Sequence, residues 1–262
     1  MTSVIFFDID GTLVTEDARK TIPESTRRAI ALARKNGCLT FINTGRTIFN
    51  VSRDVRSLGF DGYICGCGTY IEYKGDVLLR NSLEQSFCRK IAGIVRECGV
   101  TPVYEHRDGY FFDDTAVHNA GLDDFLDVFV DEGIPVDRRV DDPEFLFDKF
   151  VIWENPGCDM ERFRREIGGY FDIIDRGGGF CENVPLGFTK ATAIEKVLKM
   201  LDIPIENAYA IGDSANDLPM LRAVPNSIAM GGAEGIYPYV SYITTSINDD
   251  GIYNALKHFR LI

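Results

Sequence analysis

Short, continuously apolar segments alternate with amphipathic ones, and this alternation constrains the fold more than any other feature of the sequence. In the first, Val4–Phe7, β-branched and aromatic side chains leave no polar face, as in a strand buried on both sides. Similar strands are expected at 38–42, 61–65, 208–211 and 227–230, with a shorter one at 242–244. Helical periodicity separates them, from Pro23 to near Gly37 and at 48–58, 191–201, 215–221 and 252–259. Strands that alternate with helices along the chain predict right-handed crossovers and a parallel sheet, which is an α/β fold.

The middle of the chain follows a different order. Residues 69–73 and 77–79 alternate in polarity around Lys74-Gly75-Asp76, which predicts an antiparallel hairpin. Helices are then expected at 84–98, 119–132 and 159–168, and strands at 101–106, 109–113, 146–153, 171–175 and 179–183. This mixture predicts an α+β domain, residues 83–183, inserted into a core domain formed by residues 1–82 and 184–262.

Charge and composition limit the partners. The formal net charge of the 262 residues is -12, which disfavours nucleic acid and anionic membranes but allows a small anionic substrate in a locally positive or metal-containing cleft. No apolar run approaches the roughly 18 residues needed to span a bilayer, and Val4–Phe7 is too short for a signal peptide. We therefore expect a cytoplasmic protein. The oligomeric state stays open.

The seven cysteines form no C-x-x-C pair. Cys65 and Cys67 stand in a C-x-C arrangement, which offers too few ligands for a closed zinc site. Free thiols, mostly buried, are therefore expected.

The first strand ends in Asp8-Ile9-Asp10-Gly11-Thr12. Open α/β sheets bind ligands at the carboxyl ends of their strands, so both carboxylates can face one small site there. Close carboxylates repel each other, and a divalent cation would keep them ionised. Taken alone, the run is equally well explained as a solvated turn that Asp10 caps.

Two further segments have the character of an anion site. Asn43-Thr44-Gly45-Arg46 follows the second strand and combines a hydroxyl, a glycine amide and a helix start, although Thr44 could simply cap that helix. Lys190 lies in the first turn of the helix that follows the insertion, where the helix dipole disfavours a cation. Another purpose for Lys190 is plausible, but read alone it is better explained as a surface lysine.

The run Ile211-Gly212-Asp213-Ser214-Ala215-Asn216-Asp217 has the clearest chemical character. Two acids and an amide crowd one strand end, and they offer the hard oxygen ligands that suit Mg²⁺. A capped loop is the weaker interpretation. All four segments lie at strand-to-helix junctions that a parallel sheet brings to one edge, and their residue types match phosphoryl transfer.

With these four motifs in order, the chain resembles the haloacid dehalogenase (HAD) superfamily of phosphatases. The resemblance is to the Cof-type branch, with its large α+β cap (type IIB) between the second and third motifs. It covers essentially the whole chain. The resemblance implies a Rossmann-like core that carries the motifs, with the inserted domain as a lid that sets substrate specificity.

The resemblance also implies residue roles. Asp8 would attack phosphorus and form an aspartyl-phosphate, and Asp10 would act as general acid and then general base. Mg²⁺ would be held by the Asp8 carboxylate, the Asp10 backbone carbonyl and Asp213, with Asn216 and Asp217 as ligands or supports of the ligands. Thr44, the Gly45 amide and Lys190 would bind the phosphoryl oxygens, and Arg46 is a candidate substrate contact.

The chain departs from the family at Cys67-Gly68-Thr69, where Asn-Gly-Ala is frequent. That asparagine normally braces the active-site edge or reaches the substrate, and Cys67 lacks its amide. Cys67 is expected to be a small filler, and a reactive role is the less favoured alternative.

The expected function is hydrolysis of a small phosphorylated metabolite, such as a sugar phosphate or a phosphorylated cofactor. A phosphomutase or phosphotransferase with the same intermediate is an alternative, and a non-catalytic phosphate-binding signalling domain is a less favoured one.

Overall fold

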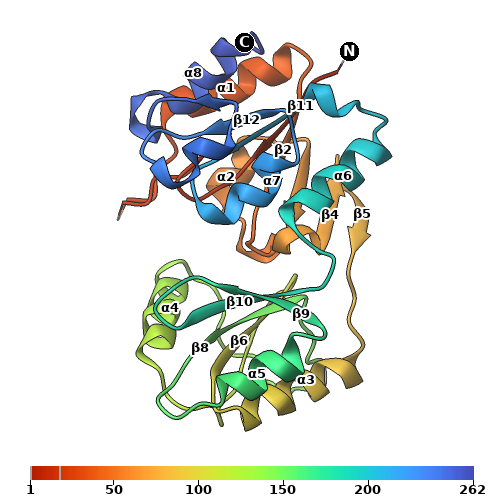
Figure 1. The fold of residues 1–262 in the computed structure, drawn as a ribbon, viewed down its shortest axis with the longest axis vertical. Coiled ribbons are helices and arrows are strands. Elements are labelled where there is room, and N and C mark those ends of the chain that lie inside the picture. The colour runs from red at the N-terminus through yellow and green to blue at the C-terminus, as the bar shows by residue number, and fades with distance from the viewer. Residues whose placement is uncertain (1, 18) are drawn as a thin grey trace. The chain divides into compact units, whose positions relative to one another are not determined.

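The computed structural model describes residues 2–17 and 19–262, which form two compact units (Figure 1). The core unit comprises residues 1–46, 51–80 and 188–262, and the inserted unit comprises 47–50 and 81–187. The sequence placed these limits at 82/83 and 183/184 and did not separate 47–50. Phe49 belongs with the inserted unit, where its ring centroid lies 6.0 Å from that of Tyr110.

An eight-stranded sheet forms the centre of the core unit, in the order β13-β12-β11-β1-β2-β3-β4-β5. Its first six strands are parallel, and β4 and β5 complete it as an antiparallel hairpin. Phe7 of β1 pairs with Ile211 of β11 on one side and with Ile42 of β2 on the other, so the three central strands end level with one another. The strands are β1 (Val4–Phe7), β2 (Leu39–Asn43), β3 (Gly62–Cys65), β4 (Tyr70–Tyr73), β5 (Asp76–Arg80), β11 (Ala208–Gly212), β12 (Asn226–Ala229) and β13 (Tyr242–Ile243).

Helices cover both faces of this sheet and make three layers (Figure 1). Helices α6 and α7 cover the face that bears Val4, Phe6 and Phe41, and Ile194 and Val197 of α6 pack against these side chains. Helices α1 and α8 pack together on the other face. The helices are α1 (Glu24–Lys35), α2 (Arg53–Ser57), α6 (Lys190–Met200), α7 (Leu218–Arg222) and α8 (Gly251–His258), and 3-10 turns lie at Gly66–Gly68, Ile205–Asn207, Ala215–Asp217, Glu234–Tyr239 and Ile247–Asp249. The α/β prediction is confirmed.

The inserted unit contains a five-stranded antiparallel sheet in the order β7-β6-β8-β10-β9. Helices α3 and α5 pack on one face over a core rich in phenylalanine, and α4 packs on the other face. The elements are α3 (Gln85–Glu97), β6 (Thr101–His106), β7 (Gly109–Phe112), α4 (Ala120–Asp131), β8 (Lys149–Trp153), α5 (Met160–Ile167), β9 (Phe171–Asp175) and β10 (Phe180–Pro185), and a 3-10 turn lies at Ile48–Asn50.

Three predicted elements were wrong in extent. The helix expected at 48–58 is broken, because Ser52 is extended and caps a new helix by accepting a hydrogen bond from the Val55 amide at 3.3 Å. The helix expected at 215–221 begins as a 3-10 turn, and its α-helical part starts at Leu218. The strand expected at 146–153 begins only at Lys149, since Phe147 is buried in the core beside the sheet without joining the ladder.

Every helix in the described part of the chain is too short or too polar to span a bilayer.

Candidate active site

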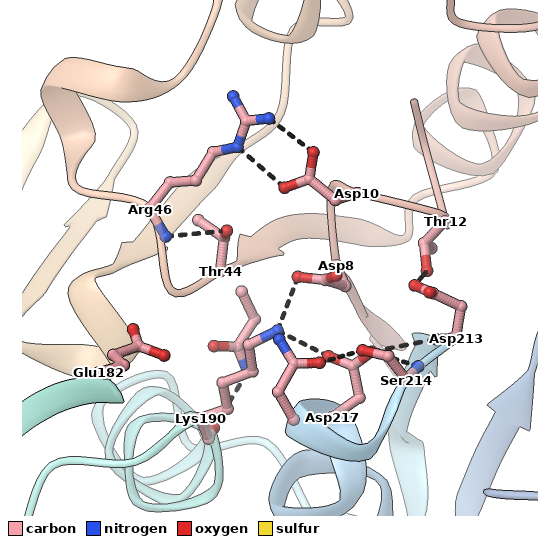
Figure 2. A network of polar contacts seen from close by, with 12 residues as sticks. Asp8, Asp10, Thr12, Thr44, Arg46, Glu182, Lys190, Asp213, Ser214 and Asp217 are labelled. Carbon is pink, nitrogen blue, oxygen red and sulfur yellow. Dashed lines mark hydrogen bonds and ion pairs between the residues drawn. The ribbon is translucent and has the colours of Figure 1, made fainter. Parts of the chain in front are cut away.

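The predicted site residues gather at the carboxyl edge of the core sheet (Figure 2). Asp8 follows β1, and its backbone amide donates to the carbonyl of Ile211 at 3.0 Å, which extends the ladder by one residue. Thr44 follows β2 and is fixed in the same way by the carbonyl of Ile64 at 3.0 Å. Asp213 follows β11. Asp8 and Thr44 are almost completely buried, so these side chains sit on rigid strand ends.

Lys190 connects two of the motifs through its ammonium group. Its Nζ lies 2.6 Å from Oδ1 of Asp8 and 2.6 Å from Oδ1 of Asp217, and the side chain is only 3% exposed. The lysine is the first residue of α6, whose N-cap Thr189 exchanges hydrogen bonds with Thr192 in a capping box. Lys190 is therefore a buried counter-charge, and the alternative of a surface lysine is wrong.

Asp213 is placed by the loop after β1. Thr12 Oγ1 donates to its Oδ1 at 2.8 Å. Gly11 makes this approach possible, because a Cβ built there would lie 2.3 Å from Oδ2 of Asp213, and its φ of +71° is one that other residues rarely adopt. The sequence contained Thr12 within the first motif but gave no signal that its hydroxyl reaches a residue about 200 positions away.

Asp217 connects the fourth motif, residues 211–217, to the lysine. Its Oδ2 accepts hydrogen bonds from the amides of Asp213 at 3.0 Å and Ser214 at 3.2 Å, while its Oδ1 faces Lys190. Asn216 lies beside it, and its side-chain oxygen contacts the Ser214 hydroxyl. The contacts of Asp217 are those of a residue that supports its neighbours.

Asp10 and Arg46 form a pair at the solvent side of the site. The guanidinium Nε and Nη2 donate to the two carboxylate oxygens of Asp10 at 2.9 and 2.6 Å, and the Asp10 side chain is 51% exposed. The backbone amide of Arg46 also donates to the Thr44 hydroxyl at 3.1 Å. Figure 2 shows Asp10 turned toward Arg46 and away from Lys190.

Backbone contacts brace the loop that contains Cys67. The Cys67 amide donates to the carbonyl of Thr44 at 3.1 Å, and the Gly66 amide donates to the carbonyl of Arg46 at 2.8 Å. Cys67 is buried and adopts a left-handed conformation with φ +54°. The loop after β3 therefore supports the loop after β2 through its main chain.

Carboxylates outnumber the ammonium at this edge. Asp8, Asp213 and Asp217 each have an oxygen within 4.8 Å of the others. Burial and repulsion from Asp217 raise the pKa of Asp8 to about 8, although Lys190 acts in the opposite direction. Burial and Asp217 also raise the pKa of Asp213 to about 7, against the hydrogen bond from Thr12. Burial opposes ionisation of Lys190, but the two carboxylates that face it raise its pKa.

This arrangement fits a divalent cation. The donors are hard carboxylate oxygens. Burial raises the two aspartate pKa values most, and the negative charge of Asp217, which adds to that rise, is charge a cation would balance. Asp8 and Asp213 could serve as side-chain ligands. Asp217 already contacts Lys190 and two backbone amides through its oxygens.

Known proteins resemble the chain over its whole length. Residues 5–256 match the haloacid dehalogenase-like hydrolase family. The candidate phosphatase YkrA of Bacillus subtilis is 30% identical over 262 residues, which cover 99% of this chain and 98% of YkrA. The phosphatase YcsE of the same organism, named for 5-amino-6-(5-phospho-D-ribitylamino)uracil, is 25% identical over 98% of this chain and 96% of its own.

Solved structures agree with these relatives. A hypothetical protein from Geobacillus kaustophilus shares 25% identity and a TM-score of 0.85, with full coverage of both chains. A sugar phosphatase of HAD subclass IIB shares 26% identity and a TM-score of 0.81 over 99% of this chain and 100% of its own. The chain therefore belongs to the haloacid dehalogenase-like hydrolase family, and it is an enzyme of the phosphatase type.

Proposed function

We propose that the protein hydrolyses a small phosphorylated metabolite with the help of Mg²⁺ and through an aspartyl-phosphate on Asp8. The observation that carries the proposal is the buried Lys190 bridge between Asp8 and Asp217, with Asp213 close to both carboxylates. A buried carboxylate held by an ammonium, beside a cluster suited to a cation, matches the needs of phosphoryl transfer. The non-catalytic alternative has no support from the family.

In the first step, an oxygen of Asp8 attacks phosphorus and the bond from phosphorus to the leaving oxygen breaks. The carboxyl proton of Asp10 passes to that oxygen. In the second step, Asp10 removes a proton from water, the water oxygen attacks phosphorus, and orthophosphate leaves as the Asp8 carboxylate is restored. Asp10 is paired with Arg46 at 2.6 Å, so we place the opening of this pair before proton donation.

Charge on the phosphoryl oxygens would be balanced by groups from the loop after β2 and from the start of α6. We assign this role to the Thr44 hydroxyl, the Gly45 amide and the Lys190 ammonium, with Arg46 as a candidate substrate contact. Mg²⁺ would be held by Asp8, Asp213 and the Asp10 carbonyl, and it would neutralise charge that develops during transfer. Asn216 and Asp217 would keep these ligands in place.

The inserted unit is proposed as the cap that sets specificity. It contains a buried network in which Lys149 lies 3.1 Å from Glu105 and 2.5 Å from Glu182, and Arg176 also pairs with Glu182. Charged groups on a sheet face are expensive to bury, so they are candidates for polar recognition. The named substrates of two relatives are a phosphorylated ribityl compound and sugar phosphates, which supports a phosphorylated sugar or a related cofactor precursor as substrate.

Asp8→Asn tests the proposal most directly. Phosphate release from p-nitrophenyl phosphate with Mg²⁺ should fall to background while the urea unfolding curve stays cooperative. Asp76→Asn makes the same change at an exposed position on β5 and should leave turnover intact. Substantial activity in Asp8→Asn would refute the nucleophile, and full activity in EDTA would refute the metal. If added sugar receives the phosphoryl group and no orthophosphate appears, the enzyme is a transferase.

A further inference from the structure

Asn43 is the last residue of β2, and it joins two of the proposed phosphate-binding groups. Its side chain is completely buried, and its Nδ2 donates to the backbone carbonyl of Lys190 at 3.0 Å. The next residue in the chain is Thr44. We propose that Asn43 is a positioning residue that fixes the spacing between the Thr44 hydroxyl and the Lys190 ammonium. This inference rests on the proposed function, in which those two groups bind the phosphoryl oxygens.

Strand periodicity explains how Asn43 reaches α6. Alternate residues of β2 share a face of the sheet, so Asn43 continues the row of Leu39 and Phe41. Leu39 and Phe41 pack in the same apolar cluster as Ala193 and Ile194 of α6. At the end of this row an amide replaces the apolar side chain and meets the first residue of the helix.

Fold stability gives little reason for an amide at this place. Oδ1 of Asn43 is buried without a hydrogen-bond partner in the described part of the chain, which is unfavourable for a polar atom. The carbonyl of Lys190 lies in the first turn of α6, where a helix already supplies an amide donor. A leucine, which has the same branched shape and a somewhat larger volume, would extend the apolar row and remove the unpaired oxygen.

The amide instead ties the start of α6 to the strand that carries Thr44. The Lys190 ammonium must stay 2.6 Å from both Asp8 and Asp217, and its backbone is held on one side by the Thr189 cap and on the other by Asn43. Misplacement of a binding group by about 1 Å can lower a rate about 100-fold. Loss of the Asn43 contact should therefore reduce turnover by about 10- to 100-fold.

The test compares Asn43→Leu with the wild type by the kcat and KM for p-nitrophenyl phosphate, the Kd of orthophosphate from calorimetry, and the Tm. We expect a Tm equal to or above that of the wild type, a kcat lower by about 10- to 100-fold, and weaker orthophosphate binding. Thr26→Val is the matched control, since it also removes a buried oxygen that has no partner among the described residues, here a hydroxyl on α1. If Asn43→Leu does not fold, Asn43→Ala takes its place.

A double-mutant cycle with Lys190→Ala separates positioning from general packing. If Asn43 acts through Lys190, Asn43→Leu should change neither the residual activity nor the orthophosphate Kd further in the Lys190→Ala background. Independent, multiplicative effects of the two substitutions would overturn the inference. Wild-type kinetics and orthophosphate binding in Asn43→Leu would also overturn the inference. A loss of activity that a fall in Tm fully explains would do the same.

The same experiment separates the two proposals. If the wild type binds orthophosphate but releases none from the substrate, the proposed function fails while the cycle on orthophosphate Kd still decides the role of Asn43. If the wild type does not bind orthophosphate at all, both proposals fail.

Discussion

Removal of the Lys190 charge should destabilise the core unit strongly, and to an extent that depends on pH. Each contact of its ammonium, with Asp8 and with Asp217, is 2.6 Å long and almost fully buried. With an effective dielectric constant near 20, each attraction amounts to about 6 kcal/mol before desolvation is counted. Desolvation offsets much of this gain, but removal of one partner leaves buried carboxylates uncompensated. Lys190→Met should therefore lower the free energy of unfolding by about 3–5 kcal/mol at pH 8.

The pH dependence has a definite sign. The folded-state pKa of Asp8 is raised to about 8 from an ordinary value of 3.8, so the folded state binds this proton more tightly than the unfolded state. The stabilisation from that proton is present at low pH and is lost as the pH rises through the folded pKa. In Lys190→Met the pKa of Asp8 should rise further. The loss of unfolding free energy that Lys190→Met causes, relative to the wild type, should thus be smaller at pH 5.5 than at pH 8.

Urea unfolding in EDTA at the two pH values measures this deficit. Lys199→Met provides the control, since it makes the same change at an exposed position of the same helix and should shift stability by less than about 0.5 kcal/mol. A loss below about 1 kcal/mol in Lys190→Met at pH 8, or a deficit that grows as the pH falls, would refute the role of Lys190 as buried counter-charge.

Three further predictions concern the proposed metal site. Mg²⁺ should raise the Tm of the wild type more at pH 8 than at pH 5.5, because the raised pKa values of Asp8 and Asp213 make protons compete with the cation. Calorimetry near pH 7 should detect proton release on Mg²⁺ binding for the same reason. Equal Tm shifts at both pH values would contradict this prediction. Thr12→Val should weaken Mg²⁺ binding by about 10- to 100-fold in a calorimetric titration, since the hydroxyl that orients Asp213 is lost; an unchanged Kd would rule this role out. Gly11→Ala should abolish phosphate release and lower the free energy of unfolding by more than Gly37→Ala does, since Gly37 has a similar positive φ but open space around it. Equal losses of unfolding free energy in urea would show that the contact with Asp213 does not matter.

The sequence predicted which residues meet, because parallel strands bring their carboxyl ends together whatever the details of packing. Asp8, Thr44 and Asp213 could be placed at one edge from strand order alone, and the level register of β1 with its two neighbours confirms that placement. The spacing of residues along the chain does not give distances across the fold. Lys190 could therefore be expected near phosphate, but its bridge between Asp8 and Asp217 could not be foreseen.

Features that depend on one local contact were harder to predict. The apolar periodicity of 48–58 continues without interruption. The structure nevertheless has a 3-10 turn at Ile48–Asn50 and a separate helix α2, because the hydroxyl of Ser52 accepts a hydrogen bond from the Val55 amide and caps a new helix. Asn43 and Thr12 stand inside two of the predicted motifs, but nothing indicated their partners, because each acts through a single hydrogen bond to a residue far away in sequence. Periodicity reports the average environment of a face, and single polar contacts do not change it.

The capping box of α6 stands where the chain re-enters the core unit. The connection from the inserted unit ends at Gly187, and Lys190 follows only three residues later. Thr189 and Thr192, on either side of Lys190 in the sequence, exchange hydrogen bonds of 3.0 Å in both directions. The box closes the first turn of α6 around the backbone of Lys190. Both threonines belong to the core unit, so the backbone that carries the lysine is held by contacts in which the inserted unit takes no part.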